Sequence, residues 1–525
     1  MRVMTVLIII VLILGLGGLF AWYFAKPFVE DHWHRIASDA KATKGTITIA
    51  MDNWVGYYPL CSEEMERRMR SEGYLLKCED DNADYPARMK RLKDGSVNFA
   101  VATVDSYLRN AADLHFPGTI IAPIDESSGG DAMVARKDKV PNLDALKRAE
   151  FLIAFTPASP SEHILLTAGI HFDIPYLRTK GAWRIEAEGS TDALKKFQKK
   201  EVDVAVLWQP DVARALEEDG VIKILSTADM SKVIVDILLV NRDYSQKHPE
   251  IVALLLSHYF QTLKHYRDNE SALVGEIAKA RSVSKAQAEE MIRGVKWITL
   301  YESVYEWFGT ETQGGLPVEW MVDTIQSTVK ILVASGIFPR NPIPDEDPDR
   351  LLLSEPIASL YKNEGAAGLV EASAASAAAN VFAGDPLTKD FAPLTIAQWE
   401  KELRAVGTLK IEPITFQSGT AVLPLGGKEE LDRAAENLKH YPNFRVLITG
   451  HTSLSGDRAA NKKLSQERAD AVRQYLMVTF GIDEDRLLAL GWGSEKPLPR
   501  LPEESPTARN FRLPRVELTL MGELH

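Results

Sequence analysis

Cysteine is scarce in this chain, which has only Cys61 and Cys78 among 525 residues. Two thiols cannot complete a tetrahedral zinc site by themselves, so we expect no metal site and no cofactor. In an exported chain, two cysteines favour a disulfide, whereas in a reducing compartment they would be two buried thiols. We therefore predict a Cys61–Cys78 disulfide if the chain is exported.

A basic surface and catalytic motifs are also missing. The chain has 61 Lys and Arg residues against 73 Asp and Glu residues, a net charge of −12. A general nucleic-acid-binding protein needs a basic stripe, so nucleic acid is excluded as a partner. The G-x-S-x-G, H-E-x-x-H and P-loop motifs do not occur, and the 11 histidines are scattered. The sequence therefore predicts a binding protein rather than an enzyme.

Charge is absent from Met4 to Phe24, a run of 21 residues that is long enough to cross a bilayer as a helix. Trp22 and Tyr23 lie near its end, where aromatic residues meet the membrane surface. A cleaved signal peptide is the alternative, but the small residues of a cleavage site are poorly placed. We predict a single-pass inner-membrane anchor at residues 1–25, followed by periplasmic domains.

Local composition divides the rest of the chain into four parts. Residues 26–44 form a polar spacer, and residues 341–405 are rich in Pro, Asp and Ala, as linkers are. Residues 45–340 alternate strand and helix patterns twice before a mainly helical return, and residues 406–525 form a smaller α/β domain. The predicted fold class is α/β throughout.

Three short patterns follow one another in residues 45–340. They are Trp54, Gly56 and Pro59 after the first strand, Gly95–Phe99 before a buried strand, and Glu201–Ala205 leading to Trp208–Pro210. In this order they resemble the periplasmic solute-binding proteins of the nitrate, sulfonate and taurine transporter type. The resemblance implies a two-lobed, type II periplasmic-binding-protein fold, with a small-molecule ligand between the lobes. It also implies an ABC transporter permease, or another envelope protein, as a partner.

Ligands of open α/β sheets bind beyond the carboxyl ends of the strands, and four loops of this segment occupy such ends. We predict ligand contacts from Asn53, Trp54, Tyr57, Thr103, Asp105, Ser128, Asp131, Ser159, Ser161 and Trp208. Ser159 and Ser161 stand at a helix start, whose free N–H groups suit an anion, so we expect a small anionic solute. Both serines could equally be helix caps, the tryptophans could belong partly to the core, and Glu162 would repel an anion.

The last segment is similar to the OmpA-like C-terminal domain, a β-α-β-α-β module that binds peptidoglycan. The matching residues are Phe416, Gly419, Leu431, Pro442, Gly450–Thr452, Gly456, Asn461, Leu464–Ser465, Arg468–Ala469, Gly481–Ile482, Arg486–Leu487, Gly491, Gly493 and Val516–Glu517. The resemblance implies that Thr452, Ser453, Asp457, Asn461, Leu464, Arg468 and Arg515 contact peptidoglycan.

The resemblance also implies how this loop would hold the diaminopimelate of the peptide stem. In the family an Asp after the His-Thr pair takes the amino group, and an Arg fifteen residues later takes the carboxylate. Here Arg468 is present, but Ser453 stands at the Asp position, with Asp457 as a nearby substitute. Loss of a charge-assisted hydrogen bond costs about 1.5–3 kcal/mol, so we expect weaker muropeptide binding.

The sequence therefore predicts a membrane-anchored periplasmic protein. It would capture a small anionic solute and be held at the cell wall by its OmpA-like domain. The alternative is a structural envelope tether whose solute-binding-like lobe docks a protein partner.

Overall fold

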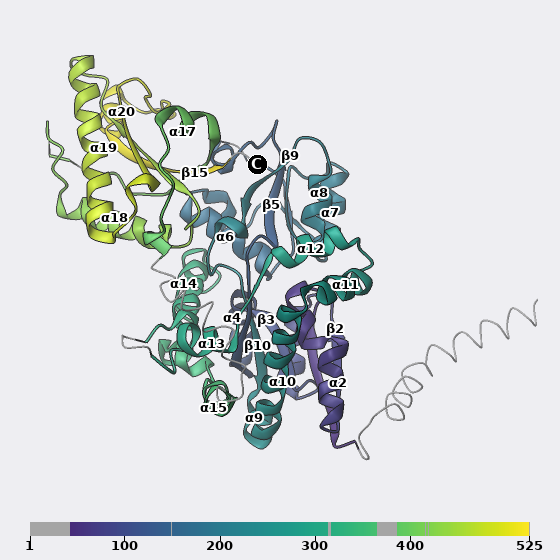
Figure 1. The fold of residues 1–525 in the computed structure, drawn as a ribbon. Coiled ribbons are helices and arrows are strands. Elements are labelled where there is room, and N and C mark those ends of the chain that lie inside the picture. Colours follow the sequence, from purple (N-terminus) through teal and green to yellow (C-terminus); the bar gives the residue numbers. More distant parts are fainter. Residues whose placement is uncertain are drawn as a thin grey trace, which may run out of the picture.

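The computed structural model describes residues 43–148, 150–312, 317–364, 386–414, 416–417 and 419–523. These residues form two α/β lobes and a C-terminal domain, each with its own sheet (Figure 1). The predicted anchor at residues 1–25 lies outside the described residues. No helix in the described ranges has the length and apolar character needed to span a bilayer.

The first lobe is built on a six-stranded mixed sheet in the order β11-β4-β10-β3-β1-β2. Its strands are β1 (Gly45–Met51), β2 (Tyr74–Asp80), β3 (Phe99–Thr103), β4 (Gly118–Ser127), β10 (Val235–Asn241) and β11 (Val295–Trp297). Strand β1 runs parallel to β2 and β3, whereas β10 is antiparallel to β3 and β4. The apolar run of β10 is buried on both faces, as expected for a central strand.

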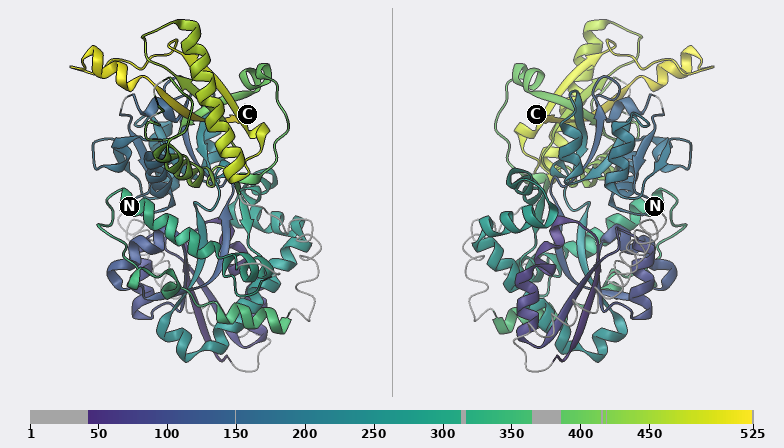
Figure 2. Two further views of the ribbon diagram at one scale, coloured as in Figure 1. Left: turned by 90° about the vertical axis from the view of Figure 1, so that its left-hand side faces the viewer. Right: turned by 90° about the vertical axis from the view of Figure 1, so that its right-hand side faces the viewer.

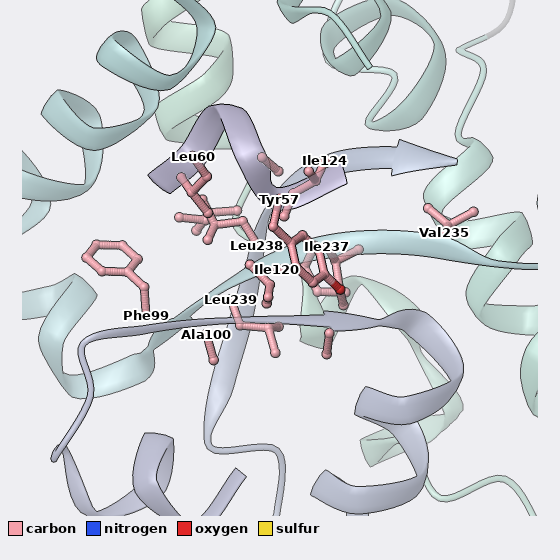
Figure 3. Packing of buried hydrophobic residues seen from close by; sticks show 14 of the residues in the cluster. Tyr57, Leu60, Phe99, Ala100, Ile120, Ile124, Val235, Ile237, Leu238 and Leu239 are labelled. Carbon is pink, nitrogen blue, oxygen red and sulfur yellow. The ribbon is translucent and has the colours of Figure 1, made fainter. Parts of the chain in front are cut away.

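Helices cover both faces of this sheet and complete the core of the first lobe. They include α2 (Glu63–Ser71), α3 (Tyr85–Asp94), α4 (Val104–Ala111), α10 (Pro249–Asp268), α11 (Glu270–Arg281), α12 (Lys285–Arg293) and α14 (Trp320–Ala334). Figure 3 shows Tyr57, from the 3-10 helix η1 (Val55–Cys61), reaching in among Ile120 and Ile237 of the sheet. The disulfide predicted for Cys61 and Cys78 is present and joins η1 to β2.

The second lobe has a five-stranded sheet in the order β7-β6-β8-β5-β9. Its elements are β5 (Asp131–Arg136), α5 (Leu143–Leu146), β6 (Ile153–Phe155), α6 (Pro160–His171), β7 (Arg184–Glu186), α7 (Ser190–Gln198), β8 (Val204–Trp208), α8 (Asp211–Leu216) and β9 (Val221–Ser226). The chain passes between the lobes twice, from β4 to β5 and from β9 to β10. The predicted two-lobed, periplasmic-binding-protein-like architecture is therefore present.

Part of the segment predicted as a linker is folded onto the first lobe. It contains η6 (Pro344–Glu346), η7 (Pro348–Leu351) and α15 (Glu355–Glu364). Leu351 and Ile357 are fully buried in the first-lobe core, and the N–H of Leu353 donates to the carbonyl of Ile120 at 2.9 Å. Residues 365–385 lie outside the described ranges.

The C-terminal domain has a four-stranded sheet in the order β12-β15-β13-β14. Its elements are α17 (Ile396–Glu402), β12 (Leu403–Thr408), α18 (Leu425–Leu438), β13 (Arg445–His451), α19 (Arg458–Phe480), β14 (Leu487–Gly493), α20 (Pro506–Arg512) and β15 (Arg515–Glu523). Strands β13 and β14 are parallel, and β15 is antiparallel to β12 and β13. The expected alternation of strands and helices is present, with β12 beginning inside the predicted linker.

The C-terminal domain packs directly on the second lobe, as the views in Figures 1 and 2 agree. Buried apolar residues of the two bodies form one continuous core. Tyr441 meets Phe172 edge to face, and Gly407 is so close that a Cβ there would lie 2.7 Å from the Phe172 ring. The N–H of Lys410 donates to the carbonyl of His171 at 2.7 Å. The domain is therefore seated on the second lobe rather than suspended from a linker.

Candidate functional site: the interlobe cleft and the C-terminal loop

The cleft between the lobes is closed around a cavity of about 20 Å³, which is room for about one water molecule. Its lining comes from both lobes and the second crossover: Asp52, Trp54, Tyr57, Tyr85, Thr103, Asp131, Pro160, Trp208, Ile234 and Asp236. Four of these residues are aromatic and three carry carboxylates. None of the described lining residues is a lysine or an arginine.

Trp54 closes the cleft from the side of the first lobe. Its indole N–H donates to Asp125 at 3.2 Å, and its ring lies against Gly130 in the first crossover. A Cβ at Gly130 would lie 2.2 Å from this ring, so only glycine allows the approach. Gly56 leaves similar space, because a Cβ there would lie 2.0 Å from the Asp125 carboxylate. The glycine in the W-x-G pattern thus makes room for a buried acid.

Two carboxylates face each other at the centre of the sheet. Asp125 on β4 is the direct partner of Asp236 on β10, and Asp236 accepts a hydrogen bond from the Tyr57 hydroxyl. Burial raises the pKa of both acids. The charge of Asp125 raises the pKa of Asp236 further, whereas hydrogen bonding with Trp54 and Asp236 partly lowers the pKa of Asp125. Two carboxylates on directly paired residues of a buried sheet cannot both be ionised, so the pair holds a proton near neutral pH.

Asp131 extends this acidic cluster into the second lobe. The Ser127 hydroxyl donates to its carboxylate at 2.7 Å, and burial raises the pKa of Asp131 to about 7. Asp105 is also buried, and burial raises its pKa too. Carboxylates from both lobes therefore converge here at a large cost in desolvation.

The buried cation beside the cleft is Arg88, and acidic side chains of the chain itself already pair with it. Arg88 is fully buried, pairs with Asp52 at 3.1 Å and with Asp81, and donates to the carbonyl of Val101 at 2.8 Å. Asp52 in turn accepts from the backbone of Trp54 at 3.0 Å. Because Arg88 is saturated by the chain's own acceptors, it offers nothing to an anionic ligand.

The start of α6, where we expected an anionic group of the ligand, is filled by Glu162. This carboxylate is buried, accepts from the N–H of Ala158 at 2.8 Å, and pairs with Arg109 at 2.6 Å and Arg184 at 2.8 Å. Ser159 acts as the helix cap and accepts from the N–H of Ser161 at 3.2 Å. Glu162 thus occupies the position at which we predicted an anionic group of the solute.

The structure brings five of the ten predicted ligand residues into the cleft: Trp54, Tyr57, Thr103, Asp131 and Trp208. Asn53 and Ser128 are exposed outside it, Asp105 is buried behind it, and Ser159 and Ser161 belong to the helix start.

Sequence reasoning missed Asp52, Tyr85, Asp125 and Asp236. The available signal was an acid inside an apolar strand, as in "VIVDILLV" around Asp236, because such burial is costly without a purpose.

The second candidate site is the loop between β13 and α19. The N–H of Thr452 donates to Gly493 at 2.9 Å, and the N–H of Leu454 donates to the Asn510 side chain at 3.1 Å. The Asn461 amide donates to the carbonyl of Ser455 at 2.9 Å. Asp457 caps α19 by accepting from the N–H of Ala460 at 2.8 Å. The loop is therefore held at both ends, with the half-buried Ser453 between them.

Helix α19 carries Arg468 and lies very close to the sheet. A Cβ at Gly450 would lie 2.1 Å from the carbonyl of Ser465, whose hydroxyl accepts from the N–H of Gly493 at 2.8 Å. These contacts set the distance between α19 and the strands β13 and β14. Leu464, one turn before Arg468, is half-buried.

Arg468 is buried, but part of its guanidinium group makes no hydrogen bond to the described residues. Its Nε donates to the carbonyl of Thr420 at 3.0 Å, and the group lies 4.8 Å from the centre of the Phe416 ring. Its two terminal nitrogens make no hydrogen bond to the described part of the chain. They could receive a carboxylate in a bidentate pair. Arg515, in contrast, is engaged by Glu517 at 2.6 Å.

Comparison with known proteins places a family match on this domain: residues 415–510 match the OmpA family. The probable lipoprotein YiaD of Escherichia coli is 36% identical over 107 residues, which are 20% of this chain and 47% of that protein. The peptidoglycan-associated lipoprotein of Rhizobium meliloti is 35% identical over 85 residues, 16% of this chain and 48% of that protein. The chain spans about half of the length of these curated relatives.

Solved structures resemble the two-lobed part. The aliphatic sulphonate binding protein SsuA of Escherichia coli has 14% identity and a TM-score of 0.46, covering 59% of this chain and 99% of that chain. The nitrate-binding protein NrtA of Synechocystis has 13% identity and a TM-score of 0.45, covering 63% and 91%.

The raised pKa of Asp131 predicts how stability depends on pH. The native protein holds this proton more tightly than the unfolded chain, so its stability falls as pH rises from about 4 to about 7. Asp131→Asn keeps the acceptor for Ser127 but removes the buried charge. We expect this variant to gain up to about 4 kcal/mol in the free energy of unfolding above pH 7, measured by urea denaturation.

The exposed Asp138 provides the matched control for this experiment. Asp138→Asn should follow the parent protein across the same pH range. Equal stability of Asp131→Asn and the parent at about pH 8 would contradict the buried charge.

Proposed function

We propose, from the membership of the C-terminal domain in the OmpA family, that this chain is a cell-envelope binding protein. The OmpA-family domain holds it at peptidoglycan, and the two-lobed domain binds a small solute with a cationic group in the interlobe cleft. The role is binding and not catalysis.

The convergence of acids and aromatic rings supports a cationic solute. Carboxylates of Asp131 and Asp236 meet the rings of Trp54 and Trp208 in one small space, beside Asp52, which is paired with Arg88. Aromatic faces and carboxylates together suit an ammonium group, which the rings attract and the acids neutralise. This chemistry differs from that of the anionic solute expected from the sequence, which finds no support in the charges of the cleft.

The closed cleft implies that the lobes separate before a solute enters. A volume of about 20 Å³ is far below the several hundred Å³ of an ordinary small-molecule pocket. The two crossovers are the places where the backbone would turn, and Gly129 in the first has φ of +114°. The structure then corresponds to the closed arrangement of the protein.

The same small volume favours a second candidate function, a structural tether whose two-lobed domain docks a protein partner. In that case the cleft stays closed, and the acids serve only the internal contacts of the two lobes. Solute-binding experiments distinguish the two functions.

An inner-membrane anchor and a periplasmic location belong to the same proposal. The uncharged run from Met4 to Phe24 supports an anchor, and the Cys61–Cys78 disulfide fits an oxidising compartment. A membrane permease or another envelope protein would then be within reach as a partner.

Peptidoglycan binding depends on Arg468 under this proposal. Arg468→Ala removes the two terminal nitrogens and should abolish co-sedimentation of the full chain with purified peptidoglycan. Ser453→Asp adds the missing anion and should tighten binding on the order of tenfold or more, since a charge-assisted bond contributes about 1.5–3 kcal/mol.

Lys463 lies on the same helix with an exposed side chain, so Lys463→Ala serves as the matched control. It should leave the sedimented fraction unchanged. Unchanged sedimentation of Arg468→Ala would show that this domain does not use Arg468 for binding.

Solute binding is tested by isothermal titration of the full chain with two matched panels. One panel contains small primary amines and quaternary ammonium compounds, and the other contains nitrate and aliphatic sulfonates. We expect binding from the first panel only, weakened at least tenfold by Asp236→Asn, because the carboxylate supplies the negative charge. Binding from the anionic panel would overturn the cationic assignment, and no binding from either panel would favour the tether.

A further inference from the structure

A larger cavity of about 530 Å³ lies where the two lobes and the C-terminal domain meet. Its walls are α6 of the second lobe, α14 of the first lobe, the second crossover at residues 231–233, and the end of α18. Figure 1 shows α6, α14 and α18 converging at this junction. The volume is in the range of small-molecule pockets, and no residue of its lining is shared with the interlobe cleft.

Lys232, in the second crossover, is one of five charged residues in the lining of this junction cavity, beside Asp323, Lys330, Glu436 and Lys439. Its ammonium lies 3.5 Å from the centre of the Trp320 ring and makes no ion pair within 4.0 Å to the described residues. Burial lowers the pKa of Lys232 to about 8. By contrast, Lys439 at the rim already pairs with Glu436 at 2.8 Å. Glu126, Asp323 and Glu306 offset this burial only in part, so an anion in contact with the ammonium would relieve the remaining cost.

Three further residues of the lining carry a polar atom without a partner. The Nδ1 of His163 and the hydroxyls of Thr167 and Thr324 make no hydrogen bond in the described structure, and all three side chains are at least nine-tenths buried. Native proteins leave few such groups unpaired, and because each of these three atoms is closed to solvent, its side chain would have to turn to meet a ligand in the cavity. Hydroxyls and an imidazole pair readily with the oxygen atoms of an anion.

The junction cavity also connects the crossover to the C-terminal domain. The N–H of Ser231 donates to the carbonyl of His440 at 2.9 Å, and His440 stacks on His171 of α6. A molecule held here would touch the segment that turns when the lobes move and the domain that carries the OmpA-family loop.

We propose that the junction cavity is a further binding site, separate from the interlobe cleft and the β13–α19 loop, for a small organic molecule or ion that carries a carboxylate or phosphate group. Lys232 supplies the positive charge, and Thr167, Thr324 and His163 supply the hydrogen-bonding groups. Occupancy would fix the second crossover against α18 and so stabilise the seating of the C-terminal domain. The proposal does not depend on which solute enters the interlobe cleft.

Thermal unfolding and isothermal titration of the full chain test this site with citrate and with inorganic phosphate, which separate the two oxyanion sources. We expect at least one of them to bind and to raise the melting temperature. Lys232→Gln should weaken that binding at least tenfold. Thr324→Val should also weaken it, while raising the melting temperature of the ligand-free protein, because it removes an unpaired buried hydroxyl.

Lys285→Gln is the matched control, since Lys285 is an exposed lysine at the start of α12. It should bind the oxyanion as the parent does. Failure of both citrate and phosphate to bind, or equal binding by Lys232→Gln and the parent, would overturn the proposal.

Discussion

The facing carboxylates of Asp125 and Asp236 are the constraint around which the first-lobe side of the cleft is built. They sit opposite each other in the middle of a buried sheet, where two negative charges cannot persist without protons or a counter-charge. Neighbouring hydrogen-bond donors compensate these two negative charges only in part. Trp54 and Tyr57 donate hydrogen bonds to the pair, and Gly56 and Gly130 leave room for the Asp125 carboxylate and the Trp54 ring. Protons supply the remaining neutralisation, unless a cation does so.

The two crossovers connect the cleft to the rest of the molecule. The first crossover carries Gly130 against Trp54, and the second carries Ser231, which is bonded to the end of α18. The C-terminal domain is seated on the second lobe through a continuous apolar core. A protein held at the cell wall through this domain would therefore hold its second lobe still, and the first lobe would be the part that moves.

The sequence predicted the elements of the fold better than it predicted the site. Strand alternation and helix caps are local signals, so the two lobes and the C-terminal domain could be predicted from them. The disulfide could be predicted because an exported chain with just two cysteines favours their pairing. Contacts between distant segments could not. The pairing of Asp125 with Asp236 follows from strand register, and the filling of the α6 start by Glu162 follows from Arg109 and Arg184 on other elements. The Pro- and Asp-rich segment looked like a linker because its few buried residues, such as Leu351, are spaced irregularly.

The most direct test of the account is the number of protons released when a cationic solute binds. Titration of a binding amine near pH 7, in buffers with different ionisation enthalpies, measures that number. If the solute's charge replaces the protons held by Asp125, Asp131 and Asp236, about one proton should leave for each solute bound. Binding without any proton release would contradict the claim that these buried acids exchange a proton for the positive charge of the solute.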